Sequence, residues 1–413
     1  MKYSLFLPCA GGVEEWLADE AMRLLGPQTA GTIERGGIAL EGDWQDVMKL
    51  NLGSRLAQRV LVRVAHGPYR LEDDLYQLAR EVWWPGWLSS RQTFRIDTTA
   101  QRSPLRSLNF ATLKVKDALC DVMRDEFGER PSVDTQRADM RVMLHLTETH
   151  ATIYVDTSGE PLFKRGWRED KGEAPLKETL AAAMLAAAGW RGTEDSGGAL
   201  LDPCCGSGTI PIEAAQIACG IAPGLKRRFA FERLAPFAGP QAREQWADLR
   251  SDAQARVHAP EVPVFASDVT FRMVDFARRN AERAGVAHAV QFNAGDALQR
   301  PAPRLPDGMP GSIMLNPPYG ERIAARGAAA SPRQRHADGQ TVPDAFFSGL
   351  AAQWKRAFTG GANPWTAWVL APEMKLPSLM RLKESRRIPM WNGPIECRLF
   401  RFDLVAGGMR ERG

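Results

Sequence analysis

The sequence predicts an α/β protein in which a doubly wound, mostly parallel sheet follows a smaller α+β region. Two observations predict the sheet. From about residue 175 onward, apolar runs alternate with helical patterns, and several of these runs end on a polar residue. Strands covered by helices on both faces read as continuous apolar runs, which is typical of parallel sheets. Before about residue 160, short strand-like runs and amphipathic helical patterns indicate an α+β region with antiparallel pairs.

The bulk composition is that of a soluble globular protein. The 413 residues are 44% hydrophobic and 25% charged, which indicates two or three domains with ample core. No apolar run approaches the roughly 20 residues needed to span a bilayer, and the N-terminus lacks the apolar segment of a signal peptide. The six cysteines show neither C-x-x-C nor framework spacing, so neither disulfides nor a metal site is expected, and a cytoplasmic location fits. The net charge of +4 permits a nucleic-acid partner but does not require one.

The elements of the first region follow from hydrophobic periodicity. The helix expected at 13–25 places Val13, Trp16 and Leu17 on roughly one face. Further helical stretches are expected at 44–60 and 109–128. Strands are expected at 3–9, 36–42 and 93–100, and as two runs with a short break within 141–159.

The second region is expected to alternate strands and helices. Pro175 is expected to open a helix, because proline is favoured at the first helical position. Strands are expected at 198–202, 262–268, 289–296, 311–316, 365–371 and 396–405. Helices are expected at 209–218, 270–285 and 345–358. Two long excursions, at about 220–260 and 321–343, interrupt this alternation.

Three carboxylates, Asp202, Asp268 and Asp296, stand at successive strand ends. In an open α/β sheet, ligands bind beyond the carboxyl ends of the strands. Gly206 and Gly208 follow the first of these strands and allow a tight turn with close backbone approach. Each Asp alone could be a helix N-cap, but the three together with the glycine turn favour a nucleoside ligand. Asp268 can accept ribose hydroxyls, Asp296 an adenine amine, and Asp202 can face a cationic amino group.

Two common phosphate motifs do not match the glycine turn. The dinucleotide fingerprint G-x-G-x-x-G fails, because Pro211 stands where the third glycine is required. A P-loop is excluded, because no G-K-[ST] follows the glycines. A diol-bearing ligand without a pyrophosphate fits better, which disfavours an NAD-dependent oxidoreductase.

The stretch Asn316-Pro317-Pro318-Tyr319 ends an apolar run and predicts an amine-recognition turn. An exocyclic amine on a purine is a poor nucleophile, because its lone pair is delocalised into the ring. The side-chain oxygen of Asn316 and the carbonyl of Pro317 could accept its two hydrogens, with the prolines keeping the backbone stiff. Tyr319 offers a face on which a flipped base could stack. The alternative is a proline-rich loop with a core Tyr, which the upstream glycine turn disfavours.

The ordered pair DPCCGSGT (202–209) and NPPY resembles class I S-adenosylmethionine-dependent amino methyltransferases. Further stretches are similar to THUMP-containing RNA methyltransferases and, among them, to the bacterial 23S rRNA guanine-N2 methyltransferases. These stretches are LFKRGWREDKGEAPLKETLAAAML, IAPGLKRRFAFE, NPPYGER and the run from AQRSPLRSLNF to RVMLHL. The resemblance covers about residues 3 to 405. Some members are fused to a second methyltransferase, and only the guanine-N2 half is resembled here.

The resemblance implies three domains and a cofactor. The domains are a ferredoxin-like segment at 1–65, a THUMP RNA-binding domain at 66–160 and a Rossmann-like methyltransferase domain at 161–413. The cofactor is S-adenosyl-L-methionine, lying on the glycine turn. The residues implied to bind it are Asp202, Pro203, Cys204, Gly206, Ser207, Gly208, Thr209, Asp268, Asp296, Ala297, Trp167, Arg168 and Pro175. Trp167 stands where the family has a Tyr, which weakens any role for a hydroxyl there.

The RNA contacts rest on the resemblance rather than on charge. Residues 91–145 hold 10 Lys and Arg against 8 Asp and Glu, which alone indicates only a solvated face. The residues expected to contact RNA are Arg102, Arg106, Lys114, Lys116, Arg165 and Arg322.

The main hypothesis is methylation of guanine N2 in 23S rRNA, with RNA as the partner. Guanine-N2 methylation of tRNA and adenine-N6 methylation of nucleic acid stay open, because the same turn serves either amine. A non-catalytic RNA-binding or ribosome-assembly protein is the alternative of another class. The intact glycine turn and Asn316 motif argue against it.

Overall fold

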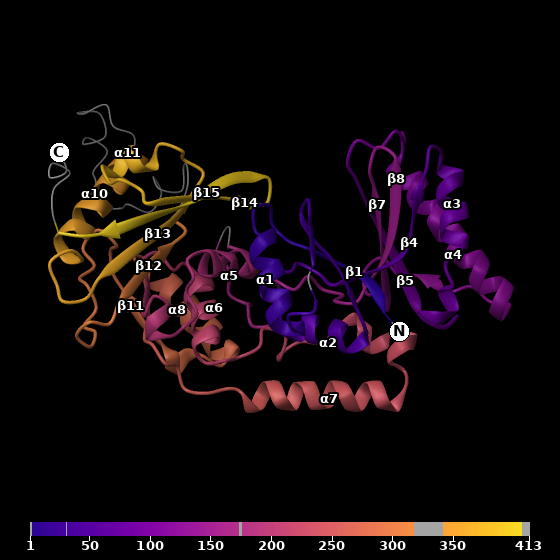
Figure 1. Ribbon diagram of the computed structural model, residues 1–413, viewed down its shortest axis with the longest axis horizontal. Helices are drawn as coiled ribbons and strands as arrows, with labels where there is room; N and C mark the ends of the chain where they lie inside the picture. The colour runs from indigo at the N-terminus through magenta and orange to yellow at the C-terminus, as the bar shows by residue number, and fades with distance from the viewer. Residues whose placement is uncertain (1, 30, 173–175, 318–341, 407–413) are drawn as a thin grey trace. The chain divides into compact units, whose positions relative to one another are not determined.

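A computed structural model of the chain describes residues 2–29, 31–172, 176–317 and 342–406 (Figure 1). The chain divides into two compact units. Unit 1 consists of residues 1–9, 17–162 and 223–255, and unit 2 of residues 10–16, 163–222 and 256–413. The predicted fold class, α+β followed by a mostly parallel α/β sheet, is confirmed.

The described part of unit 1 is built on an eight-stranded sheet with the order β2-β3-β1-β4-β8-β7-β5-β6. Its pairs are antiparallel except β5 with β6 and β5 with β7. The strands are β1 (Tyr3–Pro8), β2 (Thr32–Glu34), β3 (Gly37–Gly42), β4 (Leu61–Pro68), β5 (Thr93–Ala100), β6 (Ser132–Val133), β7 (Met140–Leu146) and β8 (His150–Asp156). The helices are α1 (Glu14–Leu25), α2 (Trp44–Gly53), α3 (Glu72–Arg80) and α4 (Leu108–Phe127), with the 3-10 turn η1 (Trp84–Gly86).

The first excursion, which no strand or helix prediction covered, belongs to unit 1 by its contacts. It contains η3 (Ala230–Arg233), η4 (Ala235–Phe237) and α7 (Pro240–Ala255). The backbone N–H of Gly224 donates to the carbonyl of Leu52, and that of Ala235 donates to the carbonyl of Trp87. The side-chain ring of Phe237 packs against Trp44. These contacts join the excursion to the body of unit 1.

Unit 2 is built on a seven-stranded sheet, counted over its described residues, with the order β11-β10-β9-β12-β13-β15-β14. The first five strands run parallel, and β15 pairs antiparallel with both β13 and β14. The strands are β9 (Ala199–Asp202), β10 (Val264–Asp268), β11 (Val290–Ala294), β12 (Gly311–Leu315), β13 (Trp365–Ala371), β14 (Arg386–Asn392) and β15 (Ile395–Leu404). The helices are α5 (Glu178–Ala187), α6 (Thr209–Ala218), α8 (Phe271–Ala284), α10 (Val342–Ala357) and α11 (Leu376–Met380), with 3-10 turns η2 (Glu194–Ser196) and η5 (Ala287–Ala289).

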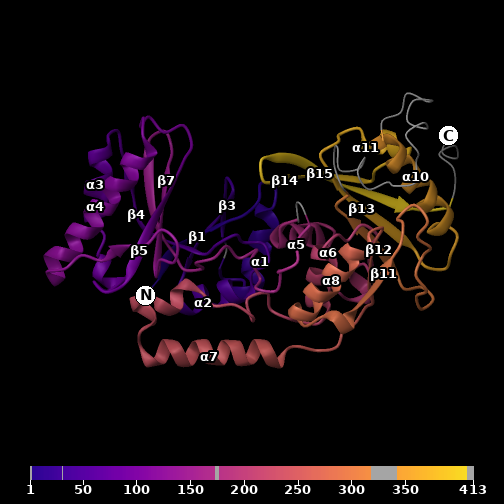
Figure 2. The ribbon, with the colours of Figure 1, turned by 180° about the vertical axis from the view of Figure 1, so that it is seen from behind.

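Helices pack on the unit 2 sheet to form its core. One cluster joins Phe347 and Trp354 of α10 and Leu376 of α11 to buried residues of β12, β13 and β15. Elsewhere α6 lies beside α5 and α8, as Figure 2 shows. Strands β9 and β12 are buried along their whole length, as expected of parallel strands inside a doubly wound sheet.

Among the differences from the sequence prediction, three concern the strands and the first helix of unit 2. Strand β14 was not predicted, because Pro389 and two leading arginines obscure its pattern, yet a proline is tolerated in an edge strand. The helix after residue 175 begins at Glu178, and Pro175 lies outside the described residues. The third strand ends at Ala294, so Asp296 follows the strand rather than ending it.

Candidate active site

The site is positioned by a reversal in strand order. Strand β9 lies between β10 and β12 and is parallel to both. From β9 the chain builds β10 and β11 on one side, then returns to build β12 and β13 on the other. The carboxyl ends of β9 and β12 therefore flank the switch point at which open α/β sheets bind ligands. Asp202 ends β9, and Asn316 follows β12 directly.

The glycine turn after β9 has a backbone that only glycine adopts readily. Gly206 and Gly208 have φ of 53° and 91°. A Cβ on Gly208 would lie 2.9 Å from the Cβ of Ala277, so this glycine permits close packing of α6 on α8. A Cβ on Gly206 would meet nothing within 4 Å. The space beside Gly206 is therefore open, and a ligand can approach the backbone there.

Asp268, at the end of β10, is bonded to this turn. One carboxylate oxygen accepts from the backbone N–H of Gly206 at 3.0 Å, and the other accepts from that of Thr270 at 3.0 Å. Each oxygen has two lone pairs, so both retain capacity to accept from ligand hydroxyls. The side chain is partly exposed, unlike that of Asp202. The geometry matches an acceptor for a ribose diol.

Asp202 is almost fully buried, at 1% exposure. Burial raises the pKa of Asp202 well above its usual value, the N–H of Cys204 lowers it, and the charge of Asp268 raises it. The side-chain oxygen accepts from the Cys204 N–H at 3.0 Å. Burial likewise raises the pKa of the Cys204 and Cys205 thiols well above the usual value, so neither is an activated nucleophile.

The third acid lies in the same region of the sheet edge. The carboxylate of Asp296 accepts from the N–H of Leu298 at 2.9 Å, and Ala297 is buried. The N–H of Gly295 donates to the carbonyl of Asp268 at 3.0 Å, which connects this loop to β10. The three acids therefore stand at or just beyond the carboxyl ends of three adjacent strands, β11, β10 and β9.

Arg168 supports the glycine turn through its side-chain bonds. Its guanidinium donates to the hydroxyls of Ser207 at 2.8 Å and Thr209 at 2.7 Å, and to the carboxylate of Glu178 at 2.7 Å. It also lies over the ring of Trp167, 4.9 Å from the centroid. Trp167 is 1% exposed, and its Nε1 has no hydrogen-bond partner among the described residues. Arg168 therefore holds the glycine turn through hydrogen bonds and is not a free surface cation.

Two residues that support the site were not predicted from sequence. Glu178 is the buried carboxylate that pairs with Arg168. Asn280 is fully buried, and its side-chain amide donates to the carbonyls of Ser207 at 3.0 Å and Asp170 at 2.9 Å. A signal for Asn280 existed, because it is a polar residue on the buried face of an otherwise amphipathic helix.

The acceptor turn is described only in part. Asn316 is half-buried, and Pro317 is buried. Pro318, Tyr319 and Arg322 lie outside the described residues. Pro203 is buried at the start of the glycine turn.

The residues predicted to contact RNA have different environments. Arg102 and Arg106 are exposed. Lys114 pairs with Asp73 at 2.5 Å and Lys116 with Asp117 at 2.7 Å, so both charges are partly compensated. Arg165 is 1% exposed and pairs with Glu213, which is fully buried. The prediction of an RNA contact at Arg165 is therefore wrong, because its charge is used inside the protein.

The arrangement fits S-adenosyl-L-methionine. The open space at Gly206 admits a ligand, Asp268 offers acceptors for a diol, and the buried carboxylate of Asp202 suits a cation. Within the described residues, no cluster of three or more His, Cys, Asp or Glu could hold a metal. None of the helices in that part of the chain has the length and apolarity needed to cross a membrane.

Comparison with known proteins identifies the family. The model described as "RMKL-like, methyltransferase domain" matches residues 165–401, "THUMP domain" residues 69–156, and "RlmL ferredoxin-like domain" residues 4–61. A protein of Psychromonas ingrahamii named ribosomal RNA large subunit methyltransferase K/L is 36% identical over 402 residues, which is 95% of this chain and 49% of that protein. The chain thus spans about half the length of the curated relatives that it matches.

Solved structures share the fold along the whole chain. A possible methylase from Clostridium difficile 630 has a TM-score of 0.81, is 27% identical, and is covered completely, as is this chain. A predicted N6-adenine-specific DNA methylase from Listeria monocytogenes has a TM-score of 0.80 at 25% identity, with 97% of this chain and 96% of that one covered. The resemblance seen in the sequence is confirmed: the chain belongs to the RMKL-like methyltransferase family, whose cofactor is S-adenosyl-L-methionine.

Proposed function

We propose that this protein transfers a methyl group from S-adenosyl-L-methionine to the exocyclic N2 amine of a guanine in 23S rRNA. The substrate class is supported by the THUMP match and by the names of the relatives. Because those relatives are about twice as long, the activity of this chain is proposed for its own catalytic unit alone. A substrate of this kind is consistent with a cytoplasmic location.

One observation carries the proposal, namely the proximity in the sheet of the glycine turn and the acceptor turn. Strands β9 and β12 are direct neighbours, and Ile313 pairs with Leu201. From that pair, Asp202 is one residue further along β9, and Asn316 is three residues beyond Ile313, just after β12 ends. A cofactor on the glycine turn and an amine at Asn316 would therefore meet at the same edge.

The chemistry required of this chain is mainly positioning. The bound cofactor supplies a methyl group on a sulfonium, which is already a good leaving group. The side-chain oxygen of Asn316 and the carbonyl of Pro317 accept the two amine hydrogens and direct the nitrogen lone pair outward. Both follow a strand that is buried along its length, so the acceptors are preorganised. Tyr319, which lies outside the described residues, stacks the flipped base in this proposal.

The remaining predicted roles are part of the same proposal. Asp268 accepts the ribose hydroxyls, Asp296 with Ala297 contacts the adenine, and Arg168 maintains the glycine turn. Arg102, Arg106, Lys114 and Lys116 contribute to RNA binding from unit 1. The division into segments 1–65, 66–160 and 161–413 is retained as the functional division of the chain.

Product analysis tests the proposal directly. Purified protein is incubated with labelled cofactor and with either 23S rRNA or bulk tRNA, and the nucleosides are separated by mass spectrometry. We expect N2-methylguanosine from 23S rRNA and little product from tRNA. N6-methyladenosine, or preferential methylation of tRNA, would show that the amine or the substrate is assigned wrongly. Cofactor binding with no methyl transfer to any RNA would favour the non-catalytic alternative.

A further inference from the structure

The segment 223–255, inserted between α6 and β10, forms a basic pocket with no role in the methyl-transfer site. The pocket has a volume of about 620 Å³. The residues lining it are Leu225, Lys226, Arg227, Arg228, Glu232, Arg243, Trp246, Ala247 and Arg250. All of them belong to unit 1, although the match to the methyltransferase domain spans them in sequence. We infer that this pocket binds the phosphodiester backbone of the RNA substrate.

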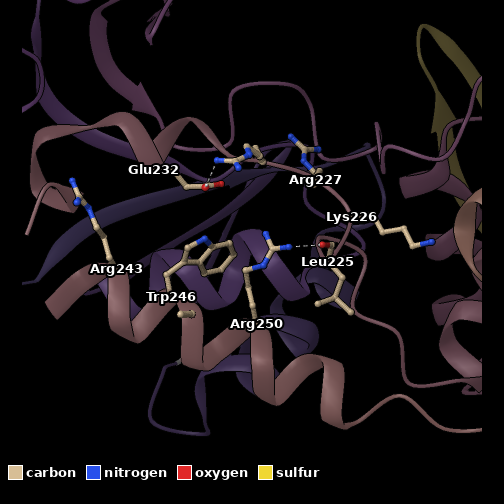
Figure 3. Close-up of a pocket in the computed structure, with 9 residues that line it drawn as sticks. Leu225, Lys226, Arg227, Glu232, Arg243, Trp246 and Arg250 are labelled. Atoms are coloured by element: carbon tan, nitrogen blue, oxygen red, sulfur yellow. Dashed lines mark hydrogen bonds and ion pairs between the residues drawn. The ribbon is translucent and has the colours of Figure 1, made fainter. Parts of the chain in front are cut away.

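The wall formed by α7 follows from helical spacing. Arg243, Trp246 and Arg250 are separated by three and four positions, so they share one face of the helix. Figure 3 shows these three side chains on the same side of α7, facing the segment that carries Leu225, Arg227 and Glu232. Lys226 points away from them.

The charge of the lining is strongly positive. Five cations and a single carboxylate, Glu232, line the pocket, for a net formal charge of +4. Arg228 lies 3.8 Å from Glu232, but its side chain is 91% exposed, so this pair neutralises little. The guanidinium of Arg243 has no hydrogen bond or ion pair with the other residues that the structure describes. A concentration of cations without matching acids attracts a polyanion.

The walls of the pocket are held in place by bonds to neutral groups. Arg227 donates to the backbone carbonyls of Pro161, Ser158 and Glu160, which do not cancel its charge. Arg250 donates to the carbonyl of Leu225 at 2.9 Å and lies over the Trp246 ring, 5.6 Å from its centroid. Arg227 and Arg250 are therefore oriented before any ligand binds, which lowers the entropy cost of binding at these two side chains.

The pocket suits a backbone rather than a free nucleotide or a base. Trp246 is only 8% exposed and packs edge-on against Phe229 and Phe231, so its face is not available for base stacking. The pocket residues include no glycine whose backbone could wrap a terminal phosphate. Contacts made by cationic side chains to phosphates position an RNA without reading its sequence. This inference rests on the proposed function, because it adds a surface for the same substrate.

The test uses the full chain with Arg228 and Arg243 both replaced by Ala. Affinity for a transcribed 23S rRNA fragment is measured between 50 and 200 mM KCl. We expect the slope of log affinity against log salt to decrease by about 1 for each phosphate that the variant no longer neutralises. Between these two salt concentrations, each phosphate contact accounts for about a threefold loss of affinity, and the variant should lack that loss for every contact removed. Both side chains are exposed, so the fold is expected to be retained and is checked by thermal unfolding.

The matched control is Arg233→Ala, which removes a cation of the same segment that lies outside the pocket and pairs with Asp139 at 3.4 Å. Its salt slope should equal that of the wild type. Arg243→Lys should retain most of the affinity, and Arg243→Glu should lose more than Arg243→Ala. An unchanged slope in the double variant would overturn the inference. A second outcome would also overturn it: the wild type binds guanosine monophosphate, the double variant does not, and the two bind RNA equally well.

The binding assay separates this inference from the proposed function. If the wild type binds RNA through the pocket but produces no methylated guanosine, the proposed function fails and the pocket assignment stands. If the wild type methylates RNA and the double variant binds RNA as tightly as the wild type, the pocket assignment fails alone.

Discussion

The carboxylate of Asp268 accepts a hydrogen bond from the backbone N–H of Gly206 at 3.0 Å, although the residues are 62 positions apart. This bond connects the end of β10 to the turn after β9. It sets the position of the acid next to the open space beside Gly206. This one hydrogen bond therefore places the expected ribose acceptor beside the space in which the cofactor is expected to lie.

Asp268→Asn should weaken binding of S-adenosyl-L-methionine by about 10- to 100-fold, because hydrogen bonds to a charged acceptor contribute about 1.5–3 kcal/mol each. The carboxylate accepts from two backbone N–H groups, those of Gly206 and Thr270. An amide has only one oxygen, so its NH2 group would face one of these N–H donors and that bond would be lost. Isothermal titration calorimetry measures the change. Asp275→Asn, at a partly exposed Asp of α8 that pairs with Arg279, serves as the control and should bind normally. Equal affinity in both variants would exclude Asp268 as a cofactor ligand.

Asn316→Ala should reduce kcat by about 10²- to 10³-fold, the typical cost of removing one preorganised polar group from a reaction centre. Cofactor affinity should be nearly unchanged, because Asn316 follows β12 and not the glycine turn. Asn316→Asp keeps an acceptor oxygen and should retain more activity than the Ala variant. Single-turnover methyl transfer to rRNA measures these rates. Full activity in Asn316→Ala would contradict the acceptor role.

Asp202→Asn should stabilise unit 2 at neutral pH. Burial raises the folded-state pKa of Asp202 well above its usual value, which is near 4 in the unfolded chain. Between these two pKa values the folded state binds more protons, so stability falls as pH rises through that window. The amide of Asp202→Asn carries no charge, so the variant avoids the cost of burying one. Its Tm advantage over the wild type should therefore shrink as pH is lowered through the window, because the wild-type carboxyl becomes protonated.

Thermal unfolding at a series of pH values measures this difference. Glu282→Gln, at an exposed position on α8, is the control and should not show the same pH-dependent gain. A Tm difference for Asp202→Asn that is independent of pH would show that burial of the charge is not its cause. The same variant should bind the cofactor more weakly, because it lacks the charge that faces a cation.

Arg168→Ala should destabilise unit 2 by about 3–5 kcal/mol, because it leaves the carboxylate of Glu178 buried without its cation. Burial already raises the pKa of Glu178, and Arg168 opposes that rise. The double variant Arg168→Ala/Glu178→Leu should recover part of the loss. Denaturant unfolding of the single and double variants gives the coupling energy. Strict additivity would show that the pair does not act as a unit.

The same double variant separates stability from function. Arg168 also bonds Ser207 and Thr209, so the recovered stability should not restore cofactor affinity. Cofactor binding equal to that of the wild type would mean that Arg168 does not position the glycine turn.

Much of the catalytic unit was predictable, because its signals are local. Buried parallel strands appear as apolar runs, and the acids that follow them stand at the ends of those runs. The glycines of the turn after Asp202 are visible in the same way, since a positive φ restricts the choice of residue. The elements 209–218 and 365–371 have the predicted bounds for this reason.

The errors and omissions concern pairings between distant residues. Strand β14 exists because β15 pairs with it along an edge. Arg165 is buried because Glu213, on α6, neutralises it. Asn280 supports the glycine turn through the carbonyl of Ser207. No local pattern contains the identity of such partners.

The sequence by itself determined the two fold classes, the acids at or near three strand ends, the glycine turn and the Asn316 motif, because each depends on residues adjacent in the chain. Only the tertiary structure decided that β9 and β12 are neighbours, that Asp268 bonds Gly206, and that segment 223–255 joins unit 1. These relationships depend on which surfaces bury one another, and burial is a property of the folded chain as a whole.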